Sequence, residues 1–145
     1  ILQELGEGNA SRGRVLFYKE RVACASCHRI DSRGGQLGPD LSQIGRIRQP
    51  RDLVEAVLYP SATVVNGYEN YAFELSGGVT LDGMIHRETR EAVYLINGGM
   101  SETRIDRKQI EHVHNSTVSL MPSGFEQILS RHELLDLIAY LQTCR

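Results

Sequence analysis

The segment Cys24-Ala25-Ser26-Cys27-His28 restricts the possible folds of this chain more than any other feature of its sequence. Two thiols three positions apart can add to the two vinyl groups of one haem, and a histidine directly after them can turn beneath the ring to bind iron. The spacing is a geometric requirement of covalent haem attachment. It therefore points to a fold organised around a planar cofactor at this place in the chain.

Three other interpretations of this motif are open at this stage. A zinc site needs a second pair of ligands, but Cys144 stands alone, and His112 and His114 lie two positions apart on an expected strand. A thioredoxin-like dithiol needs a βαβ context, whereas Cys24 follows an expected helix and precedes a glycine-rich loop. The third is a chance occurrence of a five-residue pattern, and the surrounding sequence argues against it.

Composition is typical of an ordinary soluble globular domain. The chain has 145 residues, of which 41% are hydrophobic and 23% charged, so it can bury a core without a disulfide framework. The longest apolar run, Ala92 to Ile96, is far shorter than the roughly 20 residues of a membrane-spanning helix, so we expect no membrane span. The chain begins at Ile1 without a secretory leader, and we expect a mature protein or an excised domain.

Charge is divided unevenly along the chain. Sixteen Lys and Arg against 18 Asp and Glu give a net charge of −2, which offers no case for a nucleic-acid partner. Residues 1–51 carry nine basic and five acidic side chains, whereas residues 52–145 carry seven basic and thirteen acidic ones. The two halves of the chain are electrically unlike.

Apolar periodicity predicts two helices in the first 60 residues. The first runs from Asn9, a suitable N-cap, to about Val22. Residues 34–48 contain Gly-Gly-Gln-Leu-Gly-Pro-Asp and are expected to form a loop. The second helix starts at Pro50, which suits a first helical position, and stops before Pro60.

Residues 60–117 are typical of strands rather than helices, because they are rich in β-branched and aromatic residues between glycine turns. The expected strands are Tyr68 to Leu75, Thr80 to Arg87, Ala92 to Ile96, Glu102 to Asp106 and Ile110 to Val113. They predict a four- or five-stranded antiparallel meander that can curl into a small barrel. After it, Ser130 and Glu133 form a capping box for a last helix that runs to the C-terminus.

Four sequence segments, the haem-binding motif among them, follow one another in an order that resembles a known protein family. They are the first helix with Gly13 and Phe17 ahead of Cys24-Ala25-Ser26-Cys27-His28, then Gly38-Pro39-Asp40-Leu41, Met121-Pro122, and Leu137-Ile138-Ala139-Tyr140-Leu141. This arrangement resembles the mono-haem cytochrome c family. More narrowly, Pro60-Ser61-Ala62, Gly67-Tyr68-Glu69, Ser119-Leu120-Met121-Pro122-Ser123-Gly124 and Leu129-Ser130 are similar to the C-terminal haem-binding domain of large planctomycete-type dehydrogenase-like proteins.

The resemblance implies a fold class and several site roles. The expected fold is a mainly α cytochrome c fold over residues 1–145 as a single domain, with a β-rich insert at 60–117, α+β overall. Haem c would be attached through Cys24 and Cys27, and His28 would be the proximal iron ligand. Pro39 would offer a backbone carbonyl to the Nδ1 proton of His28. Gly13 and Phe17 would meet Tyr140 where the terminal helices cross.

The sixth iron ligand must come from farther along the chain. The candidates are Met84, Met100, Met121, His86, His112, His114 and His132. Met121 is preferred because it lies in a loop shortly before the last helix. It follows His28 by 93 positions, and removing the 58 residues of 60–117 leaves 35, which suits a compact cytochrome loop. His112 and His114 are its main rivals.

A haem iron held by His28 and Met121 is closed to substrates, which predicts an electron-transfer domain rather than an enzyme. It would relay single electrons from a fused or partner dehydrogenase to another redox protein. The alternative is an open or labile sixth site that serves a peroxidase or a gas sensor. Covalent haem attachment in bacteria takes place outside the cytoplasmic membrane, so we expect a periplasmic or equivalent location.

Three smaller expectations concern side chains outside the motif. Arg46, Arg48 and Arg51 are expected to contribute to docking on an acidic partner, and Arg48 or Tyr59 can instead pair with a haem propionate. Cys144 is a candidate for an intermolecular disulfide. The strand block resembles small SH3-like or Sm-like barrels in architecture only, and we expect it to be a structural or docking insert.

Overall fold

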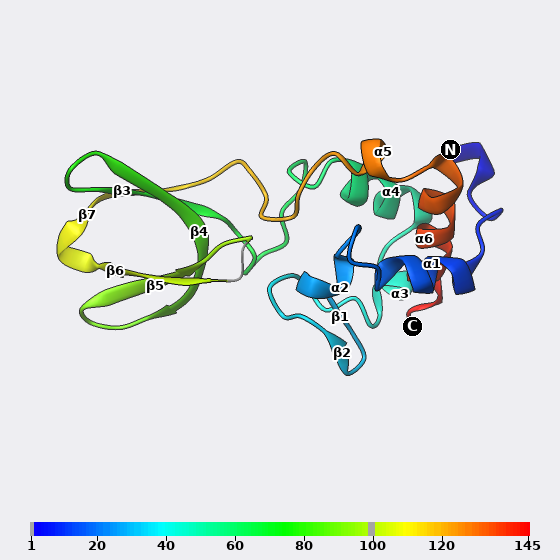
Figure 1. Ribbon diagram of the computed structural model, residues 1–145, viewed down its shortest axis with the longest axis horizontal. Helices are drawn as coiled ribbons and strands as arrows, with labels where there is room; N and C mark the ends of the chain where they lie inside the picture. Colours follow the sequence, from blue (N-terminus) through cyan, green and yellow to red (C-terminus); the bar gives the residue numbers. More distant parts are fainter. Residues whose placement is uncertain (1, 99–100) are drawn as a thin grey trace. The chain divides into compact units, whose positions relative to one another are not determined.

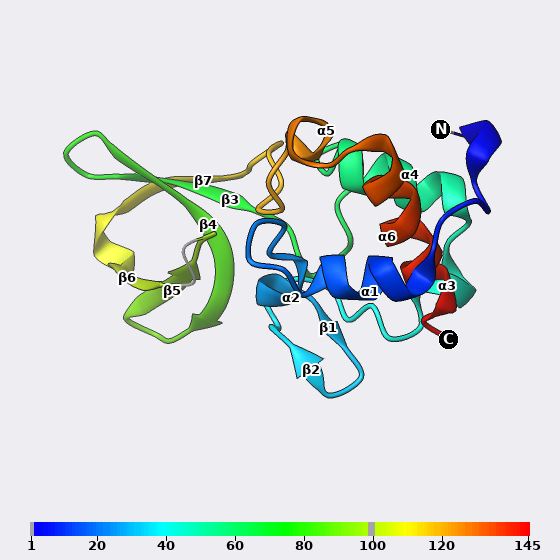
Figure 2. The same ribbon diagram turned by 45° about the vertical axis from the view of Figure 1, so that its right-hand side comes forward.

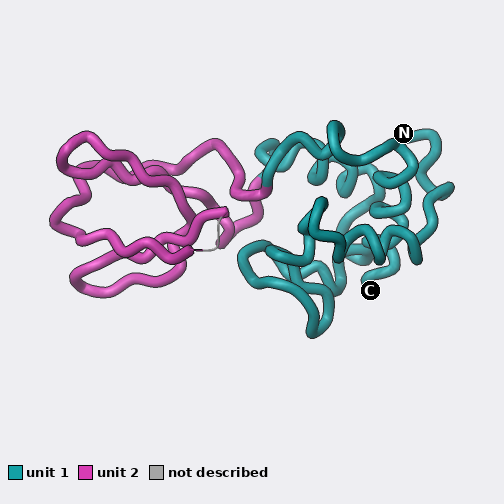
Figure 3. The backbone as a smooth tube through the Cα atoms, in the orientation of Figure 1, with its two compact units in different colours: residues 1–63, 122–145 teal, residues 64–121 magenta. Residues whose placement is uncertain are grey.

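A computed structural model of the chain describes residues 2–98 and 101–145. The chain divides into two compact units, residues 1–63 with 122–145 and residues 64–121 (Figure 3). The first unit contains the α-helices and a two-stranded hairpin, and the second contains a five-stranded antiparallel sheet (Figure 1). The layout is therefore α+β, as the resemblance implied. Met100, one of the ligand candidates, falls outside the described residues.

The first unit is built from short elements around one long C-terminal helix. Its elements are η1 (Leu2–Glu4), α1 (Ala10–Phe17), α2 (Cys24–Cys27), β1 (Arg29–Ile30), β2 (Arg33–Gly34), α3 (Ile44–Ile47), α4 (Pro50–Leu58), α5 (Phe125–Ile128) and α6 (Arg131–Thr143). Within the described residues, none of these helices has the length and apolar character that a bilayer crossing requires.

The three predicted helices are present and start at the expected residues. Asn9 accepts a hydrogen bond from the Arg12 amide at the start of α1, and α4 begins at Pro50 and ends before Pro60. At the start of α6, the Ser130 amide donates to the Glu133 carboxylate at 3.0 Å, and the Glu133 amide donates back to the Ser130 hydroxyl. Capping residues and apolar spacing thus located the starts of these helices correctly.

Two sequence predictions about this unit are wrong in part. Helix α1 ends at Phe17 rather than near Val22, because the chain turns through Lys19, whose carbonyl accepts both the Val22 and Ala23 amides. Ala23 then adopts a positive φ of 54° ahead of α2. The predicted loop at 34–48 contains the four-residue helix α3, which begins at Ile44.

Helices α1 and α6 cross closely in the first unit (Figure 2). A Cβ on Gly13 would lie 2.9 Å from the Cβ of Tyr140 and closer still to the Asp136 carbonyl, so only glycine fits this crossing. The rings of Phe17 and Tyr140 meet edge to face with centroids 5.8 Å apart. The predicted contact of Gly13 and Phe17 with Tyr140 is confirmed.

A buried charge also ties these two helices together. Asp136 on α6 is 5% exposed and accepts two hydrogen bonds from the Arg12 guanidinium, at 2.6 and 2.9 Å. It accepts a third from the Asn9 amide at 2.6 Å. The Arg12 hydrogen bond, followed by the Asn9 amide, lowers the pKa of Asp136. The carboxylate is therefore ionised and fully paired where the helices meet.

The second unit is a single antiparallel sheet. Its strands are β3 (Tyr71–Leu75), β4 (Val79–Glu88), β5 (Ala92–Ile96), β6 (Glu102–Asp106) and β7 (Ile110–Asn115), with the 3-10 helix η2 (Arg107–Gln109) between the last two. The strand order is β6-β5-β4-β3-β7, so the first four strands form a meander and β7 returns to pair with β3. All five expected strands are present.

The sheet bends around its own small core. Phe73, Val93, Leu95 and Ile105 form that core, each 2% exposed or less. A register shift between Ile85 and Arg87 bends the long strand β4, which Figure 1 shows curving round. The strand order leaves β6 and β7 at the edges. Closure into a barrel therefore stays a prediction.

Candidate haem site

The two cysteines of the motif lie on one helical turn. Cys24 and Cys27 are the ends of α2, and residues three apart on a helix project from the same side. The turn is held by the Ser26 hydroxyl, which donates to the Ala23 carbonyl at 2.6 Å, and by the His28 amide, which donates to the Cys24 carbonyl at 2.9 Å. Both thiols are half-buried and free of disulfides.

Burial decides the protonation of the first thiol. It raises the pKa of Cys24 to about 11, and the neighbouring Cys27 adds a smaller contribution in the same direction. The Cys24 side chain is thus a neutral thiol in an apolar setting at neutral pH. The raised pKa disfavours the thiolate form of Cys24 that a zinc site would need.

His28 follows directly and presents one nitrogen as a ligand. Its Nδ1 lies 2.8 Å from the backbone carbonyl of Pro39, and a carbonyl can only accept, so Nδ1 carries the proton. The lone pair is then on Nε2. Burial lowers the pKa of His28, and the Pro39 hydrogen bond opposes this in part. The imidazole is therefore neutral, as iron ligation requires.

Gly38 forms a flat support for this imidazole. A Cβ at position 38 would lie 2.6 Å from Cε1 of His28 and 2.8 Å from its Nδ1. The Gly38 amide donates to the Cys27 carbonyl at 2.9 Å, which fixes the backbone at this distance. No side chain larger than hydrogen can stand here without moving the ring. The need for glycine at position 38 was not recognised from the sequence.

A polar network fixes the loop that supplies the Pro39 carbonyl. Arg29 donates two hydrogen bonds to Oδ2 of Asp40, at 2.6 and 3.0 Å. The hydroxyl and amide of Ser42 donate to Oδ1 of the same carboxylate, and the Leu41 amide donates to the Arg29 carbonyl at 2.8 Å. The Ser42 hydroxyl, its amide and then Arg29 lower the pKa of Asp40 to about 2. The loop is thereby attached to the strand that leaves His28.

In the sequence, Asp40 was recognised only as part of the motif Gly38-Pro39-Asp40-Leu41. No role was predicted for Arg29 or Ser42. An Asp followed two positions later by Ser is a local turn signal, because each side chain can bond the other's backbone. That signal was available in the sequence. The partner of the turn, Arg29, is eleven positions away and is identified only by the fold.

These groups fit covalent haem. Two thiols project from one helical turn, and a neutral imidazole beside them has Nε2 available and its ring orientation set by Pro39 and Gly38. Within residues 2–98 and 101–145, no cluster of three or more His, Cys, Asp or Glu side chains is arranged to hold a metal ion, so nothing there favours the zinc interpretation.

Comparison with known proteins agrees with this chemistry. The family model of cytochrome c matches residues 10–145, so the chain belongs to the cytochrome c family. A search of curated proteins found no match. Proteins of this family bind haem c covalently through cysteines, and haem c is the cofactor of this chain. The family is one of haem-based electron-transfer domains.

The remaining predicted site residues are divided between the two units. In the first unit, Arg48 is exposed at the end of α3, and Tyr59 is 65% exposed at the end of α4. In the second unit, Met121 is half-buried, and its amide donates to the Ser119 hydroxyl at 3.1 Å. The roles of Arg48, Tyr59 and Met121 stay predictions.

The rival iron ligands among the described residues lie on helices or strands. Met84 is half-buried in β4, opposite Ile96 of β5. The histidine candidates are all exposed: His86 on β4, His112 and His114 on the edge strand β7, and His132 in the first turn of α6. A strand residue cannot leave its position without breaking hydrogen bonds of the sheet, which argues against the four strand candidates.

The expected role of Cys144 is not supported. Its side chain is 7% exposed, and its thiol donates to the Tyr140 carbonyl at 3.6 Å. Burial raises the pKa of Cys144, so the thiolate that disulfide exchange requires is disfavoured. The burial of this thiol argues against an intermolecular disulfide, which stays a prediction.

Proposed function

We propose that this chain relays single electrons between two redox proteins, with His28 as the proximal iron ligand. The observation that carries the proposal is the hydrogen bond from Nδ1 of His28 to the Pro39 carbonyl, beside two free thiols on one helical turn. It leaves Nε2 as the ligand and holds the ring in one orientation. When bound, the haem supplies the one-electron chemistry. The protein residues orient it and limit its access to water.

The proposed sixth ligand is Met121. It directly precedes Pro122, the residue at which the chain returns to the helical unit, and it lies outside any helix or strand. Because no backbone ladder holds this segment, its thioether can approach iron without breaking regular structure. A thioether ligand raises the reduction potential relative to two histidines and closes the iron to exogenous ligands.

Replacing Met121 with alanine is expected to remove the long-wavelength thioether-to-iron absorption band of the ferric protein and to lower its reduction potential. The physical reason is the loss of a sulfur donor that favours ferrous iron. Absorption spectroscopy and redox titration measure both effects. Met84→Ala, at a half-buried methionine on strand β4, is the control and should retain the band. An unchanged spectrum for Met121→Ala contradicts the assignment.

Carbon monoxide distinguishes the relay from the alternative function. A sixth site closed by Met121 predicts slow or incomplete carbon monoxide binding to the reduced protein. Rapid and complete binding would instead favour a peroxidase or gas-sensing role. The Met121→Ala variant provides the reference for an open site in the same protein.

We propose that Arg46, Arg48 and Arg51 form a docking surface for an acidic redox partner. All three side chains are exposed, and in the described part of the chain none has a carboxylate within 4.0 Å. Unpaired charges of one sign attract a partner of opposite sign over about one Debye length, roughly 8–10 Å at physiological salt. Alternatively, Arg48 or Tyr59 pairs with a haem propionate; both lie at helix ends in the helical unit.

If this surface guides docking, the second-order rate of electron transfer to an acidic partner protein is expected to fall steeply as salt is added. Screening removes long-range attraction between exposed charges, so the rate constant falls while the reduction potential does not. Stopped-flow kinetics over a range of sodium chloride concentrations measures this. Replacing Arg46, Arg48 and Arg51 together with glutamine should flatten the salt profile. Arg90→Gln, in the strand-rich unit, is the control.

We also propose an electron donor, a cellular location and a role for the strand-rich insert. The donor is a dehydrogenase, fused upstream or separate, and the location is periplasmic or equivalent, because haem c is attached outside the cytoplasmic membrane in bacteria. The five-stranded sheet has its own core, and residues 60–117, which contain it, are proposed as a structural or docking insert within the cytochrome c domain. Determining whether the gene encodes a dehydrogenase domain ahead of Ile1 tests the fused arrangement.

A further inference from the structure

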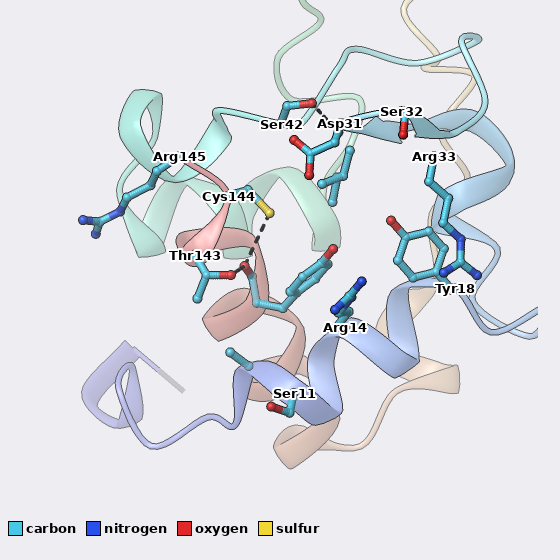
Figure 4. Close-up of a pocket in the computed structure, with 13 residues that line it drawn as sticks. Ser11, Arg14, Tyr18, Asp31, Ser32, Arg33, Ser42, Thr143, Cys144 and Arg145 are labelled. Carbon is cyan, nitrogen blue, oxygen red and sulfur yellow. Dashed lines mark hydrogen bonds between the residues drawn. The ribbon is translucent and has the colours of Figure 1, made fainter.

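A cavity of about 590 Å³ lies in the helical unit and is separate from the motif that binds haem. Its walls come from α1, from the β1–β2 hairpin and from the end of α6 (Figure 4). Neither cysteine of α2 nor His28 lines it. Its volume is within the range of small-molecule sites, which are roughly 300–1,000 Å³. Nothing in the proposed electron relay uses this cavity.

Two arginines give one side of the cavity a positive charge. The guanidinium of Arg33 lies 3.9 Å from the ring centroid of Tyr18, and this cation–π contact holds it in place. Arg14 lies on α1 near the Tyr140 hydroxyl, on whose pKa its charge acts. Across residues 2–98 and 101–145, neither Arg14 nor Arg33 has a carboxylate within 4.0 Å. Figure 4 shows the third arginine, Arg145, directed away from the cavity.

A pair of tyrosines adds a hydrogen-bond donor beside these charges. Tyr140 is 8% exposed, and Tyr18 and Tyr140 both line the cavity. Burial is the main cause that raises the pKa of Tyr140, so its hydroxyl stays protonated. A phenol hydroxyl can both donate and accept, so Tyr18 can donate a hydrogen bond to a ligand in the cavity. Arg14, Tyr18 and Arg33 thus supply donors to the same cavity.

One acidic side chain limits the charge of a ligand. Asp31 lines the same cavity, and its carboxylate acts on the pKa of the Cys144 thiol, so the two groups are close. A second negative group placed near Asp31 would be repelled. The cavity therefore suits a ligand with one oxyanion group rather than a polyanion.

We propose that this cavity binds a small molecule through a single carboxylate or phosphate group, held by Arg14, Arg33 and the Tyr18 hydroxyl. Guanidinium groups bind such oxyanions through charge-assisted hydrogen bonds, roughly twice as strong as neutral ones. The aromatic ring under Arg33 keeps that guanidinium ordered before the ligand arrives, which lowers the entropy cost of binding.

Isothermal titration calorimetry of the haem-loaded protein tests the proposal with two probes, inorganic phosphate and propionate, at constant ionic strength set with sodium chloride. We expect saturable binding of at least one probe with one site per chain, and the stronger probe identifies the oxyanion. Arg14→Gln and Arg33→Gln should each weaken that binding about tenfold, the size expected for one lost hydrogen bond to a charged group. Tyr18→Phe should weaken it less, because the ring under Arg33 remains.

Arg90→Gln is the matched control, since it makes the same charge change on an exposed arginine of the strand-rich unit. Arg14 and Arg33 are exposed, so their variants should fold, and an unchanged unfolding midpoint in urea verifies this. Absence of saturable binding for both probes overturns the proposal. So does equal binding by the Arg14, Arg33 and Arg90 variants, because the probe is then attracted by net charge alone.

Discussion

Replacing both Cys24 and Cys27 with serine is expected to abolish covalent haem attachment. Serine hydroxyls are too weakly nucleophilic to add to the haem vinyl groups, whereas the two thiols of α2 project from one helical turn toward the same side. Intact mass spectrometry of the denatured protein measures the effect, because a covalent haem survives denaturation and a ligated one does not. We expect the mass of haem to be lost completely.

Cys144→Ser provides the matched control for this double variant. Cys144 is the third cysteine of the chain, and it is buried at the end of α6 with its thiol bonded to the Tyr140 carbonyl. Its removal should leave the haem mass in place. Retention of covalent haem by the variant lacking Cys24 and Cys27, or its loss from Cys144→Ser, would show that the attachment site has been assigned to the wrong residues.

Replacing Gly13 with alanine is expected to destabilise the protein by about 2 kcal/mol. Helix propensity alone favours alanine by roughly 1 kcal/mol, so an exposed position would be stabilised. At Gly13 a Cβ would lie 2.9 Å from the Cβ of Tyr140 and closer to the Asp136 carbonyl, and overpacking of this kind costs about 1–3 kcal/mol or more. Separating the helices would also disturb the Arg12–Asp136 ion pair. Urea denaturation followed by circular dichroism measures the free energy of unfolding.

Val15→Ala is the control on the same helix. Val15 is 60% exposed, so its replacement removes little packing, and the free energy of unfolding should change by no more than about 0.5 kcal/mol. The sign of the Gly13 effect is the informative result. A Gly13→Ala protein as stable as the parent, or more stable, would mean that α1 and α6 do not approach as closely as the structure has them.

The strands and long helices were predictable because local patterns are sufficient to specify them. Glycine turns separate the apolar runs of residues 71–115, and the strands β5 and β6 have the predicted bounds. The capping box at Ser130 likewise located the start of α6. In each case, residues within a few positions of one another carry the signal.

Helix α3 was missed because its stability is tertiary. Four residues are too short for helix propensity to stabilise, since nucleation is unfavourable. The Gly45 amide donates to the Cys144 carbonyl at 2.9 Å, and a Cβ on Gly45 would lie 2.8 Å from Cα of Gln142. Contact with the end of α6, almost one hundred positions later in the chain, therefore holds this turn. The sequence on either side of α3 is typical of a loop.

The sequence by itself determined the chemistry of this protein, because covalent haem attachment needs two thiols and a histidine at one short spacing, and Cys24, Cys27 and His28 have it. The tertiary structure alone decided what surrounds that chemistry. Gly38 lies against the His28 ring, and Arg29 and Asp40 hold the loop that supplies the Pro39 carbonyl, which the family resemblance had implied. The residues that line the proposed oxyanion cavity come from α1, the β1–β2 hairpin and the end of α6. Such groups converge only when the chain folds, since no spacing in the sequence records which distant residues will meet.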